Sequence, residues 1–195
     1  MPMLSALLDR FTPQDENEAA ITRQLRQFLD TTDNAYGRDN LIAHLVADAW
    51  VVNPARDAVI LVEHGLNKMW MAPGGHCDGN PDVYAAALRE AEEEAGLTSA
   101  QLRPLLNGGI FDLNSGHVPL RRKEWGIEPV HIHFDVCFAF EADDDVPLTV
   151  SHESTGLKWV PLDGIETQGF FQGHMPRVHK TRAGRLNTAA QKVRA

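Results

Sequence analysis

The chain carries a dense group of acidic side chains near its middle, in the segment REAEEEAGL at residues 89–97. Glu90, Glu93 and Glu94 stand at positions i, i+3 and i+4, so on a helix their carboxylates project from one face, whereas Glu92 points elsewhere. Three carboxylates without a thiolate or a paired imidazole suit Mg²⁺ or Mn²⁺ better than zinc. The residues alone leave one alternative open, a solvated acidic helix face.

The flanking residues predict where this helix begins and ends. Asn80 is a favourable N-cap and Pro81 a favourable first helical residue, so we expect the helix to start at about Pro81. Gly96 stands where a C-terminal glycine would end it. The tight turn Gly74-Gly75 precedes it, and glycine there permits a backbone path that brings the turn against the helix.

Residues 75–97 resemble the Nudix box. That motif reads glycine, five residues, glutamate, seven residues, Arg-Glu, an apolar residue, any residue, Glu-Glu, any residue, glycine and an apolar residue. The positions that match are Gly75, Arg89, Glu90, Ala91, Glu93, Glu94, Gly96 and Leu97. Pro81 replaces the upstream glutamate. On these spacings the chain is identified as a member of the Nudix superfamily.

The resemblance implies a hydrolase that uses Mg²⁺ or Mn²⁺. Glu90, Glu93 and Glu94 would bind the catalytic metal, with Glu93 and Glu94 central to catalysis, and Arg89 would orient a glutamate through a salt bridge. The expected reaction is attack of water on a phosphoanhydride bond in a nucleoside diphosphate derivative or a similar small diphosphate. Because the upstream glutamate is missing, Asp78 or Asp82 is a candidate to replace it.

A general base is expected either among the box glutamates or in a later loop. Glu153, in the polar loop SHESTG before a strand, resembles the position at which some relatives carry one. A solvated loop acid is the alternative interpretation of this residue.

The strand HIHFDV places His131, His133 and Asp135 on one face and apolar residues on the other. Two histidines and an acid in line can contact phosphate, bind a second metal or shuttle protons. We expect these three residues to contact substrate, against the alternative of a half-exposed polar face.

The connection at residues 114–129, NSGHVPLRRKEWGIEP, is long for a compact domain, and long loops are often functional. Arg121 is a candidate to bind phosphate and Trp125 a candidate to stack on a base. A basic, solvated loop tip is the alternative.

Strand patterns dominate the middle of the chain and helical patterns flank them, which predicts an α/β protein with the α/β/α sandwich and mixed sheet of the Nudix fold. Strands are expected within residues 41–52, 58–64, 68–75, 102–113, 130–142 and 156–162. Residues 1–38 read as a helical N-terminal extension, with a helix that starts at Thr12 and Pro13. Residues 39–195 would form the Nudix hydrolase domain, closed by a C-terminal helix from Met175.

The composition of the chain excludes some classes of partner and indicates a cellular compartment. The net charge of −9 argues against a nucleic-acid polymer as ligand, whereas a small diphosphate that arrives with a divalent metal remains compatible. No apolar run is long enough to span a bilayer, so the expectation is a cytoplasmic protein that has no membrane partner. The two cysteines are expected to be free thiols. The N-terminal helix makes a homodimer an expectation.

Two other functions remain open. One is a nucleotide-binding module without catalysis, although the intact glutamate set argues against it. A prenyl-diphosphate isomerase that uses Cys77 is the less favoured alternative, because the rest of that family's pattern is not evident.

Overall fold

The structure is a computed structural model that describes residues 3–65, 69–123, 126–151, 154–167 and 174–187. The chain forms two compact units. The first comprises residues 1–48, 74–89 and 109–138, and the second comprises residues 49–73, 90–108 and 139–195.

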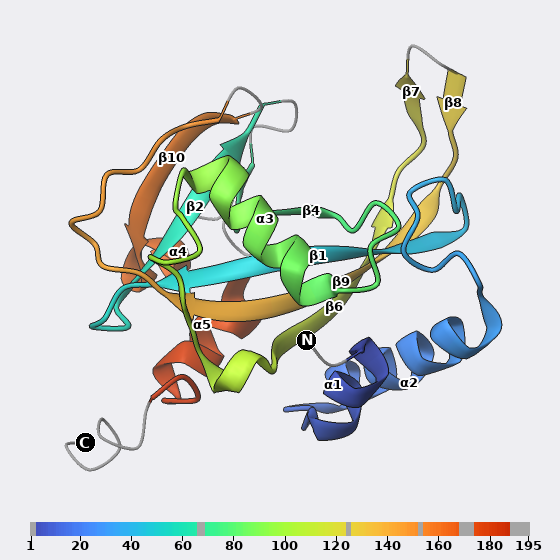
Figure 1. Cartoon of the computed structure of the whole chain (residues 1–195), viewed down its shortest axis with the longest axis horizontal. Coiled ribbons are helices and arrows are strands. Elements are labelled where there is room, and N and C mark those ends of the chain that lie inside the picture. Colours follow the sequence, from blue (N-terminus) through green and yellow to red (C-terminus); the bar gives the residue numbers. More distant parts are fainter. Residues whose placement is uncertain (1–2, 66–68, 124–125, 152–153, 168–173, 188–195) are drawn as a thin grey trace. The chain divides into compact units, whose positions relative to one another are not determined.

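The first unit combines two N-terminal helices with strands and a hairpin (Figure 1). Its complete elements are α1 (Leu4–Arg10), α2 (Glu16–Thr31), β4 (Gly74–His76), β6 (Ile110–Val118), β7 (Arg121–Lys123) and β8 (Gly126–Glu128). It also holds the first parts of β1 (Ala43–Val52), α3 (Val83–Ala95) and β9 (His131–Glu141). Here β4 pairs with β1 and β6 pairs with β9, both in antiparallel fashion.

The second unit holds the ends of β1, α3 and β9. Its complete elements are β2 (Ala58–His64), β3 (Trp70–Met71), β5 (Arg103–Pro104), the 3-10 turn η1 (Leu106–Gly108), β10 (Ser154–Pro161), α4 (Leu162–Thr167) and α5 (Met175–Arg182). β2 pairs with β10 and β3, and β5 pairs with β9. Trp50 is fully buried, and its indole N–H donates to the hydroxyl of Thr181 on α5.

The expected fold class is confirmed: the protein is α/β, with a large mixed sheet and helices. Among the described residues, eight strands belong to one sheet, in the order β10-β2-β1-β9-β5 with β3, β4 and β6 attached, and β7 and β8 form a separate ladder. Each predicted strand range contains a strand. No helix in the described part of the chain is long and apolar enough to cross a membrane.

Three boundaries differ from the sequence expectations. The second helix begins at Glu16 rather than at Pro13, because the Asp15 side chain accepts the Glu18 N–H and so supplies the cap. The glutamate helix begins at Val83 rather than Pro81, since the Asp82 side chain accepts the N–H of Ala85.

The long connection at residues 114–129 is also shorter than expected. β6 continues to Val118, and the ladder of β7 and β8 occupies most of the remainder. Of the C-terminal helix, residues 175–182 are helical, and residues 188–190 of the expected range lie outside the described residues.

Candidate active site

Helix α3 carries the acidic group, and its three aligned glutamates differ in exposure. Glu90 is buried, Glu94 is half-buried and Glu93 is exposed. Because α3 is a continuous helix from Val83 to Ala95, these three residues share one face. Glu92 points elsewhere, as predicted, and its carboxylate accepts the backbone N–H of Ser99 at 2.7 Å.

Small residues and a terminal glycine define the rest of this helix. Its alanines at positions 86, 87, 91 and 95 are fully buried, so the helix backbone can approach its neighbours closely. The helix ends at Ala95, and Gly96 follows with a φ of 67°, a conformation that favours glycine. Gly96 is therefore the predicted C-terminal glycine.

The glycine turn is fastened to both β1 and α3. Gly74 and Gly75 lie in β4 opposite Asp48 and Ala47 of β1. A Cβ on Gly74 would lie 2.9 Å from the Ala47 carbonyl oxygen, too close for any larger residue. Arg89 donates from Nη2 to the carbonyl oxygen of His76 at 2.8 Å, so it ties the helix to the end of β4. Its salt bridge to a glutamate stays a prediction.

The two candidates for the missing box glutamate both have structural tasks where the chain enters α3. Asp78 accepts two hydrogen bonds from Arg38, at 2.5 and 2.7 Å, and these bonds hold the pKa of its carboxyl below the usual range. Asp82 caps the helix through Ala85. Arg89 also lowers the pKa of Asp78, so these two side chains lie close enough to interact.

Four histidines meet in the first unit, and the sequence reasoning noticed only two of them. His44 of β1 and His76 of β4 join His131 and His133 of β9, with ring centroids 4.6–5.2 Å apart. Strand register explains the omission, because His44 and His76 are 32 residues apart and only the pairing of β4 with β1 brings their strands together. A search for histidines in neighbouring strands would have found them.

Burial keeps most of this group uncharged at neutral pH. It lowers the pKa of His76 to about 4 and that of His133 to about 3, and positive neighbours act in the same direction. Burial also lowers the pKa of His44. The imidazoles therefore offer lone pairs rather than positive charge.

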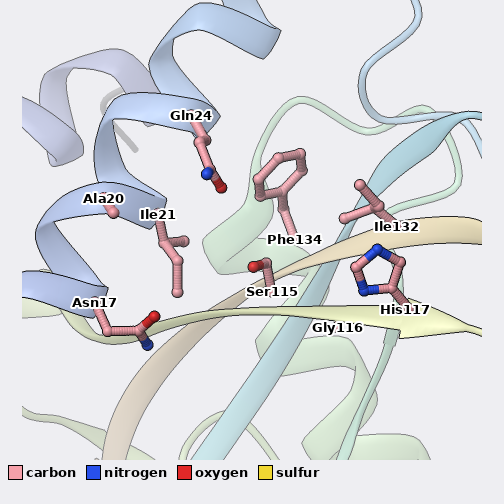
Figure 2. Close-up of a pocket in the computed structure, with 9 residues that line it drawn as sticks. All are labelled: Asn17, Ala20, Ile21, Gln24, Ser115, Gly116, His117, Ile132 and Phe134. Carbon is pink, nitrogen blue, oxygen red and sulfur yellow. The ribbon is translucent and has the colours of Figure 1, made fainter.

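A cavity of about 460 Å³ lies between helix α2 and strands β6 and β9 (Figure 2). The side chains that line it include Ile21 and Gln24 from the helix and Ile132 and Phe134 from β9. Because side chains alternate along a strand, this cavity adjoins the face of β9 opposite to His131 and His133. The cavity thus belongs to the apolar side of the strand.

Comparison with known proteins identifies the family. The family model for the NUDIX domain matches residues 43–179. This chain belongs to the NUDIX family. The match starts at the first residue of β1 and therefore excludes α1 and α2.

Solved NUDIX structures share the fold of this chain. An Ap4A hydrolase of C. elegans in a binary complex has 18% sequence identity and a TM-score of 0.50, over 73% of this chain and 96% of that one. The NUDIX domain of Shewanella oneidensis NrtR, complexed with ADP ribose, has 17% identity and a TM-score of 0.51, over 81% of this chain and 96% of that one. These two neighbours show the shared fold, and membership of the NUDIX family supports a pyrophosphohydrolase enzyme.

The remaining predicted site residues of this NUDIX domain lie on strands β7 and β9 or outside the described residues. Arg121 is half-buried in β7, and its charge helps to lower the pKa of His133. Asp135 is half-buried in β9, opposite Asn114 of β6. Trp125 and Glu153 lie outside the described residues.

Proposed function

We propose that this NUDIX protein is a Mg²⁺- or Mn²⁺-dependent hydrolase that cleaves a phosphoanhydride bond in a small nucleoside diphosphate derivative. The observation that carries the proposal is the arrangement on α3, where Glu90, Glu93 and Glu94 share one face of a regular helix. A hard cation also offsets the repulsion between like charges spaced three and four residues apart.

The donor set fits a hard divalent ion. All three groups are carboxylates, which are the ligands that Mg²⁺ and Mn²⁺ prefer. Glu90 is buried, and a bound cation would stabilise a carboxylate that has little access to water. When bound, the ion would supply Lewis-acid polarisation of a phosphoryl oxygen.

The protein groups would position the reactants and accept a proton. A water molecule attacks phosphorus, the bridging P–O bond breaks, and the bridging oxygen leaves with the departing phosphate. Glu93, Glu94 or Glu153 would accept the proton that the water loses. Arg89 would keep α3 in register with β4 through its bond to the His76 carbonyl, so that the carboxylates stay in place.

The substrate class is a small diphosphate. A net charge of −9 disfavours a polyanion but permits a compact phosphate ester that is paired with a metal. The neighbours with known ligands, an Ap4A hydrolase and a NUDIX domain complexed with ADP ribose, support nucleoside diphosphate derivatives as the first compounds to test. Arg121, Trp125, His131, His133 and Asp135 are the proposed substrate contacts.

Product release from a panel of compounds tests the proposal. Dinucleoside polyphosphates, ADP-ribose and related diphosphates, nucleoside triphosphates and prenyl diphosphates would be incubated with Mg²⁺ or Mn²⁺. Glu93→Gln and Glu94→Gln are expected to lower kcat/KM by about 10²–10⁴-fold. Glu92→Gln is the matched control, because Glu92 lies on the same helix but bonds to Ser99, and it should retain activity.

Three outcomes would count against the hydrolase. Full activity in Glu94→Gln would show that the box carboxylates do not carry the reaction. Ligand-induced thermal stabilisation without product would identify a binding module. Isomerisation of a prenyl diphosphate that is lost in Cys77→Ser would identify a thiol mechanism, although Cys77 is only 2% exposed and so poorly placed for one.

A further inference from the structure

We propose that His44, His76 and His133 form a binding site for a zinc-class transition-metal ion, in addition to the carboxylate site of the proposed hydrolase. The three residues come from strands β1, β4 and β9 of the first unit. Each offers one ring nitrogen, and the three nitrogen atoms all lie within 4.8 Å of one another. We call this group the histidine cluster.

His44 supplies the first argument, because it is buried with a lone pair that lacks a partner. The residue is 1% exposed. Its Nδ1 lies 2.9 Å from the carbonyl oxygen of Asn40, and since a carbonyl only accepts, Nδ1 carries the proton. Nε2 therefore holds the lone pair, and it has no hydrogen-bond partner within the described part of the chain. A buried acceptor without a partner is destabilising, and a metal ion would remove that cost.

His131 determines which ring nitrogen of His133 carries the proton, and the result leaves the other nitrogen able to bind a metal ion. Nδ1 of His131 donates to the carbonyl oxygen of Pro129 at 2.9 Å, which leaves the lone pair of His131 on Nε2. Nε2 of His133 lies 3.2 Å from that atom and so acts as the donor. The lone pair of the neutral His133 ring is then on Nδ1, free to bind a cation. Backbone carbonyls and neighbouring rings commonly orient metal-binding histidines in this manner.

The spacing of the nitrogens is close to that of a metal site. Tetrahedral zinc with ligands at 2.0–2.1 Å holds them about 3.4 Å apart. No two of the three nitrogens are more than 4.8 Å apart, so they need to approach one another by at most about 1.4 Å. Small rotations of the imidazole rings would supply this movement.

The electrostatics favour a cation over a phosphate. The hydrogen bonds of His44 and His131 leave lone pairs on Nε2 of His44 and Nδ1 of His133, and a neutral ring nitrogen directs a lone pair rather than positive charge at its ligand. A phosphate oxygen would be repelled by those lone pairs, so His133 would contact a diphosphate substrate only through the bound ion. Charged groups near the cluster have both signs, and they are Arg38, Asp78, Arg121 and Glu128.

Glu128 adds a negative charge that is largely withdrawn from solvent. Its side chain is 17% exposed, and its ion-pair partner Lys123 is 3.6 Å away. Its Oε2 atom is buried and accepts no hydrogen bond from the described residues. Its charge favours a cation at His44 and His76. Three imidazole nitrogens near one carboxylate suit zinc, cobalt or nickel better than Mg²⁺.

Metal binding by the full-length protein tests the site directly. Chelator-treated protein would be titrated with Zn²⁺ by calorimetry and with Co²⁺ by visible absorption, since tetrahedral Co²⁺ absorbs far more strongly than six-coordinate Co²⁺. We expect one equivalent of Zn²⁺ to bind and an intense Co²⁺ band. A Glu93→Gln, Glu94→Gln double variant should keep both signals.

Histidine variants then assign the ligands. His76→Gln and His133→Gln are expected to weaken Zn²⁺ binding at least 100-fold, a loss in line with removal of a metal ligand. The matched control is His117→Gln, because His117 is exposed on β6 and outside the cluster. Circular dichroism would verify that each variant folds, and His76 and His133 are preferred because both are only half-buried.

Different results would contradict the zinc site and the hydrolase assignment. Absence of Zn²⁺ binding in the wild-type protein, or binding that survives both histidine changes, would show that the cluster is only a buried polar network. Loss of Zn²⁺ binding in the glutamate double variant would place the ion on α3 and overturn the histidine site. Loss of diphosphate hydrolysis in Glu93→Gln and Glu94→Gln bears on the carboxylate site and does not decide whether Zn²⁺ binds the histidine cluster.

Discussion

Replacing Glu18 with alanine is expected to loosen the N-terminal helix α2 from strand β6. Glu18 is a buried acid, with 3% of its surface exposed. One carboxylate oxygen accepts the N–H of Gln14 at 2.7 Å, and the other accepts the N–H of Leu113 in β6 at 3.1 Å. The same side chain therefore closes the start of α2 and covers a backbone donor of the strand.

The magnitude follows from these two bonds. Hydrogen bonds to a charged group contribute about 1.5–3 kcal/mol each, and a buried N–H without a partner costs about 1–3 kcal/mol. Because Gln14 is exposed, water can replace its bond, so the Leu113 donor dominates. We expect Glu18→Ala to lower the free energy of unfolding by about 2–4 kcal/mol. For a chain of this size the Tm would fall by roughly 5–15 °C.

Urea and thermal unfolding, followed by circular dichroism, would measure the change. Glu16→Ala is the control, because Glu16 is exposed in the same first turn and should change the stability by less than about 0.5 kcal/mol. Glu18→Gln should fall between the two variants, since the amide oxygen can keep one of the two bonds. Equal stability of Glu18→Ala and Glu16→Ala would refute the docking of α2 on β6 through this carboxylate.

Three further changes have defined outcomes. Trp50→Phe removes the buried bond to Thr181 and should cost about 1–3 kcal/mol in urea unfolding, so a change below about 0.5 kcal/mol would contradict the packing. Gly74→Ala should lower both Tm and hydrolysis, because its Cβ would clash with the Asp48 carboxylate and lie 2.9 Å from the Ala47 carbonyl oxygen. Wild-type values for both would refute this. Although burial raises the pKa of Glu141, bonds from Arg56 and a second arginine lower it below its usual value. The ion pairs of Glu141 therefore stabilise the fold above the unfolded pKa of about 4.3, and this stabilisation is lost as the pH falls through the lower folded pKa. Glu141→Gln should be less stable than wild type at pH 7, and the difference in unfolding free energy should narrow in acid. A difference that is independent of pH would count against the ion pairs.

Local signals in the sequence predicted most of the helices and strands, but not the ladder of β7 and β8. Period-two alternation predicted β9, two apolar runs on either side of a turn predicted β1 and β2, and the glycine at position 96 predicted the end of α3. The errors occurred at helix starts, where Asp15 and Asp82 displaced the expected caps by accepting backbone N–H groups. Several residues in a row were acceptable caps, and only the folded backbone selects one of them.

The sequence by itself determined the family and the acidic face of α3, because both depend on spacings within one short segment and helix geometry converts such spacings into a shared face. The tertiary structure alone decided which histidines meet. His44, His76 and His133 belong to three strands whose pairing and register depend on the whole sheet. The tertiary structure also placed the cavity beside Ile132 and Phe134, on the opposite face of β9 from the histidines. Burial, which lowers the pKa values of His76 and His133 and leaves Nε2 of His44 without a partner in the described chain, exists only once those strands have packed.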